Sequence, residues 1–166
     1  MKTVDKYLFQ ALDNYPYNLE EVVESLDYAL SYNSKNAMAL CLYGRVYAEQ
    51  LSDYEQAKLY FQEALTLDVF AKEVYPHYIQ TLILNEDYEE VTKLIDFALT
   101  IKGIDKVEIL MKKITLFEKI QQFKKGLKLM KEVKLSILNS DYNYLIEETE
   151  KRLNKKLGKN SNKKKK

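Results

Sequence analysis

Apolar residues recur along most of the chain at intervals of three and four, the spacing of one face of an α-helix. In the clearest stretch, residues 54–67, Ala57, Phe61, Ala64 and Leu67 follow one another at steps of four, three and three. Only four Gly and two Pro occur in the 166 residues, whereas a β-rich fold needs many turns that use both. The pattern therefore predicts an all-α fold.

The same order of apolar positions recurs with a period of about 34 residues. In the unit 37–68, a first helix carries Leu40, Tyr43, Gly44 and Tyr47 before the second-helix set that starts at Tyr54. Second-helix positions that match across copies are Leu19, Val22, Leu26, Ala29 and Tyr32; Tyr54, Ala57, Phe61, Ala64 and Leu67; Tyr88, Val91, Ile95, Ala98 and Ile101; and, more loosely, Phe123, Gly126, Met130 and Val133. Four helix pairs are therefore expected, over roughly 3–36, 37–71, 72–106 and 107–140.

Polar residues at the expected starts of second helices predict N-caps. They are Asn18 to Glu21, Asp87 to Glu90, and Ser52 to Glu55, where the hydroxyl of Ser52 and the carboxylate of Glu55 suggest a capping box.

This arrangement resembles the tetratricopeptide repeat, a pair of antiparallel helices of about 34 residues. Tyr43, Gly44 and Tyr47 stand where that family has its Leu-Gly-Tyr set, and Ala57 and Phe61 stand in its Ala-Phe-Ala set. The resemblance implies an all-α, right-handed superhelical solenoid of about nine helices. It covers roughly residues 3–140 and is strongest over 37–101.

The chain departs from the family pattern at several positions. One extra residue lies between Tyr47 and Tyr54, and Val69 replaces the usual Pro after the second helix. Ile79 and Ile114 stand where the later copies would carry the Gly of the pattern.

A final segment, 141–157, predicts a capping helix that covers the open end of the array. We expect its inward face to carry Tyr144, Leu145, Ile146, Thr149 and Leu153. Gly158 predicts a helix stop, and the lysine-rich tail 158–166 is expected to be disordered.

The net charge of +1 conceals a strong asymmetry. Residues 1–101 carry seven Lys and Arg against 17 Asp and Glu, whereas residues 102–166 carry 19 against eight. No window approaches the roughly 20 apolar residues of a membrane-spanning helix, and the single Cys excludes an internal disulfide framework. We expect a soluble, cytoplasmic protein. Attraction between the acidic segment 1–101 of one copy and the basic segment 102–166 of another could give weak head-to-tail self-association.

The sequence offers little for catalysis. With one His, no site with two His ligands can form within the chain. A Cys41–His77 nucleophile would lack a third group to orient it, and no glycine-rich phosphate loop is present. We therefore expect no enzyme activity, no metal and no cofactor.

The resemblance implies that first helices line a concave groove that binds a peptide or a helix of another protein. Its candidate residues are Met38, Cys41, Arg45, Glu49, Glu73, Pro76, Gln80, Leu84, Met111, Thr115 and Lys119. Some family members clamp the C-terminal carboxylate of heat-shock chaperones with Lys, Asn and Arg. Here Arg45 is the one central cation, so a chaperone tail is disfavoured as the partner.

A basic surface in the C-terminal half indicates an alternative partner, nucleic acid or another anionic surface. Its candidate residues are Lys112, Lys113, Lys124, Lys125, Lys128, Lys131 and Lys134. Lysine runs on helices are more often solvated faces, and exposed aromatic residues for base stacking are not interleaved with this one.

Overall fold

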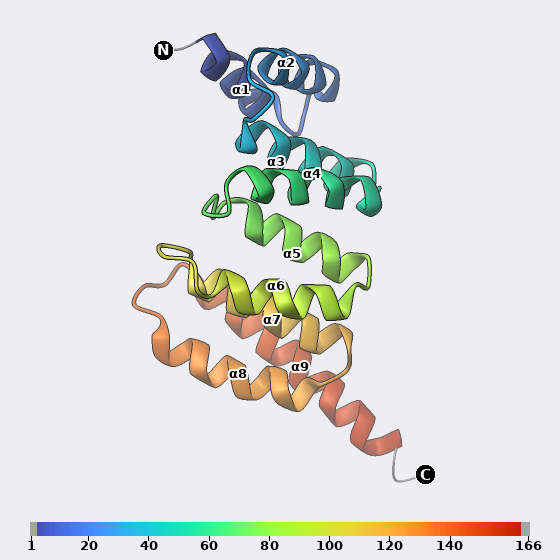
Figure 1. Ribbon diagram of the computed structural model, residues 1–166. Coiled ribbons are helices and arrows are strands. Elements are labelled where there is room, and N and C mark those ends of the chain that lie inside the picture. Colours follow the sequence, from blue (N-terminus) through green and yellow to red (C-terminus); the bar gives the residue numbers. More distant parts are fainter. Residues whose placement is uncertain (1–2, 164–166) are drawn as a thin grey trace.

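The computed structural model describes the backbone of residues 3–163 and the side chains of residues 6–158. Within that range the chain is helical, with connections and no strand (Figure 1). The elements are α1 (Thr3–Asn14), α2 (Leu19–Tyr32), α3 (Ala37–Arg45), the π-helical turn η1 (Val46–Gln50), α4 (Tyr54–Leu67), α5 (Val74–Leu84), α6 (Tyr88–Ala98), α7 (Lys106–Lys119), α8 (Phe123–Ser136) and α9 (Asn143–Lys163). The predicted all-α class is confirmed.

Consecutive helices pack as hairpins that stack along the molecule, from α1 and α2 at one end to α8 and α9 at the other (Figure 1). The odd-numbered helix α5 also packs against α3 and α7, whereas the even-numbered helices contact one another little. The first helices of the pairs therefore lie side by side in one layer, and each second helix packs against its own first helix.

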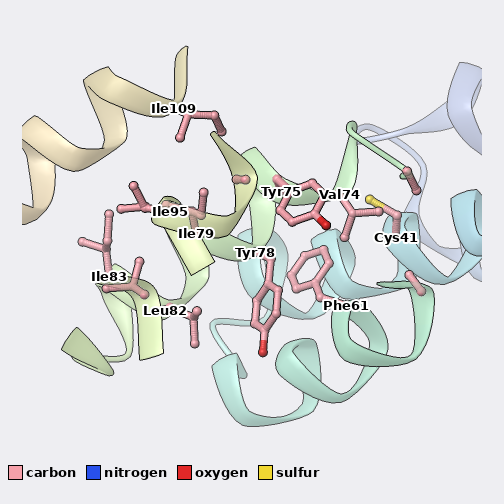
Figure 2. Close-up of a cluster of buried hydrophobic side chains, with 14 of the residues drawn as sticks. Cys41, Phe61, Val74, Tyr75, Tyr78, Ile79, Leu82, Ile83, Ile95 and Ile109 are labelled. Atoms are coloured by element: carbon pink, nitrogen blue, oxygen red, sulfur yellow. The ribbon is translucent and has the colours of Figure 1, made fainter. Parts of the chain in front are cut away.

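The buried apolar side chains form three clusters that follow the stack. One lies between α1, α2 and α3, a large central one between α3 and α7, and the last between α7, α8 and α9. Figure 2 shows the central cluster, in which Phe61 lies beside Tyr78, and Ile95 lies further along beside Ile79. Ala57, Phe61 and Ala64 are fully buried there, as the second-helix pattern predicts.

A close contact between Gly44 and Phe61 sets the approach of α3 to α4. A Cβ atom on Gly44 would lie 2.7 Å from the Phe61 ring, so no larger residue is accommodated while the ring keeps its place. In the next pair two residues of equal size, Ile79 and Ile95, occupy the positions equivalent to Gly44 and Phe61, and both are fully buried. The absence of Gly at the third copy is therefore compensated across the helix pair.

The extra residue between Tyr47 and Tyr54 is absorbed by η1. The backbone N–H of Leu51 donates to the carbonyl of Val46 at 3.3 Å, which is the i to i+5 bond of a π-helical turn. Ser52 then adopts a left-handed φ of 55°, and Asp53 caps α4 by accepting from the N–H of Gln56. The expected capping box at Ser52 is therefore wrong by one residue.

The capping helix differs from its prediction at two places. Ile146, Thr149 and Leu153 face inward as expected, but Tyr144 is 78% and Leu145 47% exposed. One inward face cannot include three consecutive residues, because each step turns a helix by about 100°.

The expected helix stop at Gly158 is also wrong. Gly158 lies within α9, which continues to Lys163. It does not take the left-handed conformation of a terminating glycine, which Gly103 adopts with φ 81° after α6. Residues 164–166 lie outside the described part of the chain.

None of the described helices is both long enough and apolar enough to cross a membrane.

Candidate binding groove

The layer of first helices is hollowed where η1, α5 and α7 approach one another. The hollow has a volume of about 510 Å³, and four of the predicted groove residues, Glu49, Pro76, Gln80 and Leu84, line it. Tyr54, His77, Glu108 and Lys112 are among the other residues of its wall. Three successive helix pairs thus contribute to one site.

Glu49, on the π-helical turn, is the centre of the polar contacts on this face. Its Oε1 atom lies 3.2 Å from Nε of Arg45 and 3.1 Å from Nδ1 of His77. The hydroxyl of Tyr15 donates to its other oxygen, and the Arg45 guanidinium lies 4.6 Å from the centre of the Tyr15 ring. Arg45 is therefore an ion-paired and stacked residue, not a free cation.

These contacts control the ionisation of Glu49. Partial burial raises the pKa of its carboxyl, but hydrogen bonds from His77, Tyr15 and Arg45, with the charge of Arg45, outweigh burial and lower the pKa to about 2. Because the folded pKa lies below the ordinary 4.5, the charged form contributes stability above pH 4.5. That contribution is lost as the pH falls towards 2.

We predict that Glu49→Gln lowers the free energy of unfolding at pH 7 by no more than about 1 kcal/mol, since the side chain is 37% exposed and solvent screens the pair. The difference from wild type should shrink between pH 4.5 and 2, as measured by urea denaturation. Glu24→Gln is the control, because Glu24 is exposed and forms no ion pair among the described residues. A Glu49→Gln difference that is the same at pH 7 and pH 2 would contradict the assignment.

Lys112 lines this hollow. The sequence pattern instead predicts it on the basic surface. Its Nζ atom donates to Oε1 of Gln80 at 2.8 Å, across the space between α7 and α5. Burial lowers the pKa of Lys112, while Glu108 and Glu49 partly oppose that shift by their charges. No carboxylate of the described residues lies within ion-pair distance of the ammonium.

Several predicted groove residues lie elsewhere. Cys41 and Met111 are 3% and 6% exposed and belong to the core, so neither offers surface to a partner. Met38 and Glu73 line a separate hollow beside the connections that follow α2 and α4. On α7, the Thr115 hydroxyl donates to the carbonyl of Met111 and Lys119 is exposed, and neither residue lines the central hollow.

The structure gives no support to a Cys41–His77 nucleophile. Burial raises the pKa of Cys41 to about 12, so its thiol is protonated near neutral pH. The imidazole of His77 instead contacts Glu49. In the described part of the chain, no three His, Cys, Asp or Glu side chains are grouped so as to hold a metal ion.

The predicted basic surface divides into two groups. Lys113 pairs with Asp96 at 2.9 Å and Lys134 pairs with Glu150 at 2.5 Å, which neutralises both. The remaining four are exposed on α8 and form no ion pair among the described residues: Lys124, Lys125, Lys128 and Lys131.

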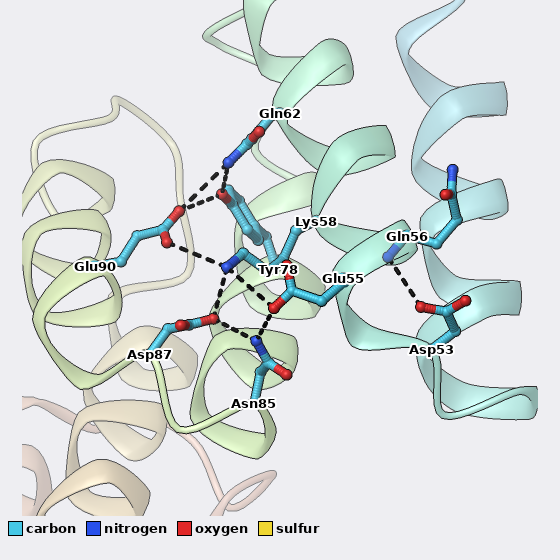
Figure 3. A network of polar contacts seen from close by, with 9 residues as sticks. All are labelled: Asp53, Glu55, Gln56, Lys58, Gln62, Tyr78, Asn85, Asp87 and Glu90. Atoms are coloured by element: carbon cyan, nitrogen blue, oxygen red, sulfur yellow. Dashed lines mark hydrogen bonds and ion pairs between the residues drawn. The ribbon is translucent and has the colours of Figure 1, made fainter.

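A polar network on the outer side joins the second and third pairs (Figure 3). Lys58 of α4 reaches Asp87 at 2.8 Å and Glu90 at 3.6 Å, at the start of α6. The hydroxyl of Tyr78 donates to Glu90 at 2.7 Å. The carboxylate of Asp87 therefore contacts Lys58 and Asn85 and accepts no hydrogen bond from the first turn of α6. Asn18, by contrast, caps α2 with its side chain. This network fixes α5, which carries the groove wall, against α4 and α6.

Sequence reasoning missed Tyr54, His77, Glu108 and Lys112 as lining residues of the hollow, and it missed the contact of Tyr15 with Glu49. His77 follows Pro76 and precedes Gln80 by three positions, so its helical spacing could have indicated it. Tyr15 lies in the connection after α1, and no local pattern places it beside Glu49.

No protein family model matches the chain, and no curated protein is significantly similar to it in sequence. The resemblance to the tetratricopeptide repeat therefore rests on the residues of this chain alone.

Proposed function

We propose that this chain is a protein-interaction module of the tetratricopeptide type, with a right-handed superhelical array that binds a peptide or helix of another protein. The observation that carries the proposal is the hollow between η1, α5 and α7, which first helices of three successive pairs line. A site shared by several repeats suits an elongated ligand that runs along the stack.

The chemistry of the hollow favours a partner segment with an acidic residue close to an apolar one. The Lys112 ammonium is partly desolvated, and its hydrogen-bond partner is the neutral amide of Gln80. Glu49 and Glu108 also line the hollow, but neither carboxylate lies within ion-pair distance of Lys112, so a ligand carboxylate would supply the direct ion pair that the ammonium does not make. Leu84, which is 41% exposed, and Pro76 offer apolar surface next to it.

Glu49 and Arg45 neutralise each other beside the hollow and hold the η1 wall in place. A ligand that competed for either group would have to break an existing ion pair, and so we assign them to the shape of the groove and Lys112 to recognition.

A peptide library tests the proposal. Peptides selected on the full chain should be enriched in acidic residues beside apolar ones, and Leu84→Glu or Lys112→Met should weaken their binding by about tenfold or more in fluorescence anisotropy. The controls are Leu59→Glu, at a leucine of α4 that is 59% exposed, and Lys113→Met, at the neighbouring lysine that pairs with Asp96. Equal losses in the control variants, or none in the groove variants, would overturn the groove as the binding site.

A further inference from the structure

The outer face of α8 carries a row of lysines that ends in exposed leucines. Lys124, Lys128, Lys131 and Leu135 are spaced by four, three and four residues, which places them on one face of the helix. The opposite face carries the buried side chains, among them Met130 and Val133. The row therefore points away from the core over the whole length of α8.

The leucines at the end of the row are almost fully exposed to solvent. Leu135 is 88% exposed, and Leu138, in the connection to α9, is 100% exposed. Tyr144, at the start of α9, is 78% exposed. Three large apolar side chains are thus exposed around the connection between α8 and α9, at the end of a cationic helix face.

We propose that this corner docks on the surface of a bilayer that contains anionic lipid, with the lysines of α8 on the headgroups and Leu135 and Leu138 inserted among the upper acyl chains. The inference is independent of the groove, which lies on η1, α5 and α7.

The charge distribution supports this orientation. On α8, Lys124, Lys125, Lys128 and Lys131 form no ion pair among the described residues, and Glu132 is the one acidic residue of the helix. Residues 1–101, with 17 Asp and Glu against seven Lys and Arg, include α1 to α6, so an anionic surface attracts the α8 end and repels the rest of the stack.

The residue types favour a membrane over nucleic acid. Lysine is a flexible point charge that suits a diffuse negative surface, whereas phosphates and bases are usually read with Arg forks and aromatic stacking. Exposed leucines have no role against a phosphate backbone. Against a bilayer they contribute by burying apolar area, and a tyrosine such as Tyr144 suits the interface between headgroups and acyl chains.

Vesicle co-sedimentation of the full chain tests the proposal. We expect binding to phosphatidylcholine vesicles that contain phosphatidylserine, and little binding to phosphatidylcholine alone. Replacing Lys124, Lys128 and Lys131 together by Gln should lower the partition coefficient by about 100-fold. The control triple replaces the exposed Lys35, Lys72 and Lys102 by Gln, which changes the net charge equally and should have a much smaller effect.

The leucines distinguish a bilayer from other anionic partners. Leu135→Ser with Leu138→Ser should weaken vesicle binding by about tenfold or more, whereas Leu51→Ser with Leu59→Ser, at leucines 58% and 59% exposed elsewhere, should not. The chain has no Trp, so Leu138→Trp gives a single reporter, whose emission should shift to the blue on vesicles while that of Leu59→Trp stays unchanged.

The proposal is overturned if wild type does not bind the anionic vesicles, or if binding survives both the lysine and the leucine replacements. Binding to random duplex or single-stranded nucleic acid that needs the three lysines but is indifferent to Leu135 and Leu138, without vesicle binding, would assign the row to nucleic acid and also overturn it. Circular dichroism of every variant confirms that the helices are retained.

Discussion

Replacing Phe61 by Ala is expected to lower the free energy of unfolding by about 3–5 kcal/mol, as measured by urea denaturation. The ring is fully buried, covers the backbone of Gly44 and stacks on Tyr78 with ring centres 5.6 Å apart. Its loss leaves a cavity where α3, α4 and α5 meet, and these helices cannot close it without shifting the groove wall.

A second substitution tests whether the close contact between Gly44 and the Phe61 ring is part of this packing. Gly44→Ala should destabilise wild type, because its Cβ would lie 2.7 Å from the ring, but should cost little or nothing once Phe61 is Ala. Phe70→Ala, at a loop phenylalanine 72% exposed, is the control and should change stability by less than about 1 kcal/mol. Additive effects of Gly44→Ala and Phe61→Ala would contradict the packing described.

Leu153→Ala is expected to cost about 2–5 kcal/mol and to loosen the C-terminal end before the rest. Leu153 is fully buried between α9 and the α7–α8 pair, and its Cδ1 atom lies 3.3 Å from where a Cβ on Gly126 would be. Since stacked helix pairs contact mainly their neighbours, amide exchange should accelerate in α8 and α9 while α3 to α6 keep their protection.

The control on the same helix is Leu145→Ala. Leu145 is 47% exposed, so its truncation should cost less than about 1 kcal/mol. The ion pairs of Arg152 and Lys156 with Glu118, at 2.7 and 2.5 Å, remain in both variants and hold α9 on α7. Uniformly faster exchange along the whole chain in Leu153→Ala would show that the stack unfolds as one unit.

The parts of the fold that repeat could be predicted from the sequence. Ala57, Phe61 and Ala64 occupy the core because a periodic apolar pattern needs only a helix and a neighbour to be interpreted. Gly44 beneath Phe61 was predictable for the same reason, since a small residue and a large one at fixed spacing indicate a close crossing.

The groove was predicted only in part, because it depends on contacts between elements that no local pattern encodes. Lys112 and Lys113 are identical in type and adjacent in sequence, yet one enters the hollow and the other pairs with Asp96 on the outside. A turn of about 100° separates them, so an error of one position in the inferred face exchanges their roles. Tyr15 reaches Glu49 across 34 positions of sequence, which only the packing of α1 on the array determines.

The turn at Val46–Gln50 also has a consequence for how this chain tolerates changes in length. An added residue in a straight helix would rotate everything after it by about 100° and turn the buried face of α4 to solvent. Here the π-helical turn takes up the added residue, and Asp53 then starts α4 anew. The apolar side chains of α4 therefore face the core as those of the neighbouring second helices do. Removing one residue from this turn should leave the stack intact but swing Glu49 away from His77, so the shape of the groove can vary independently of the scaffold that carries it.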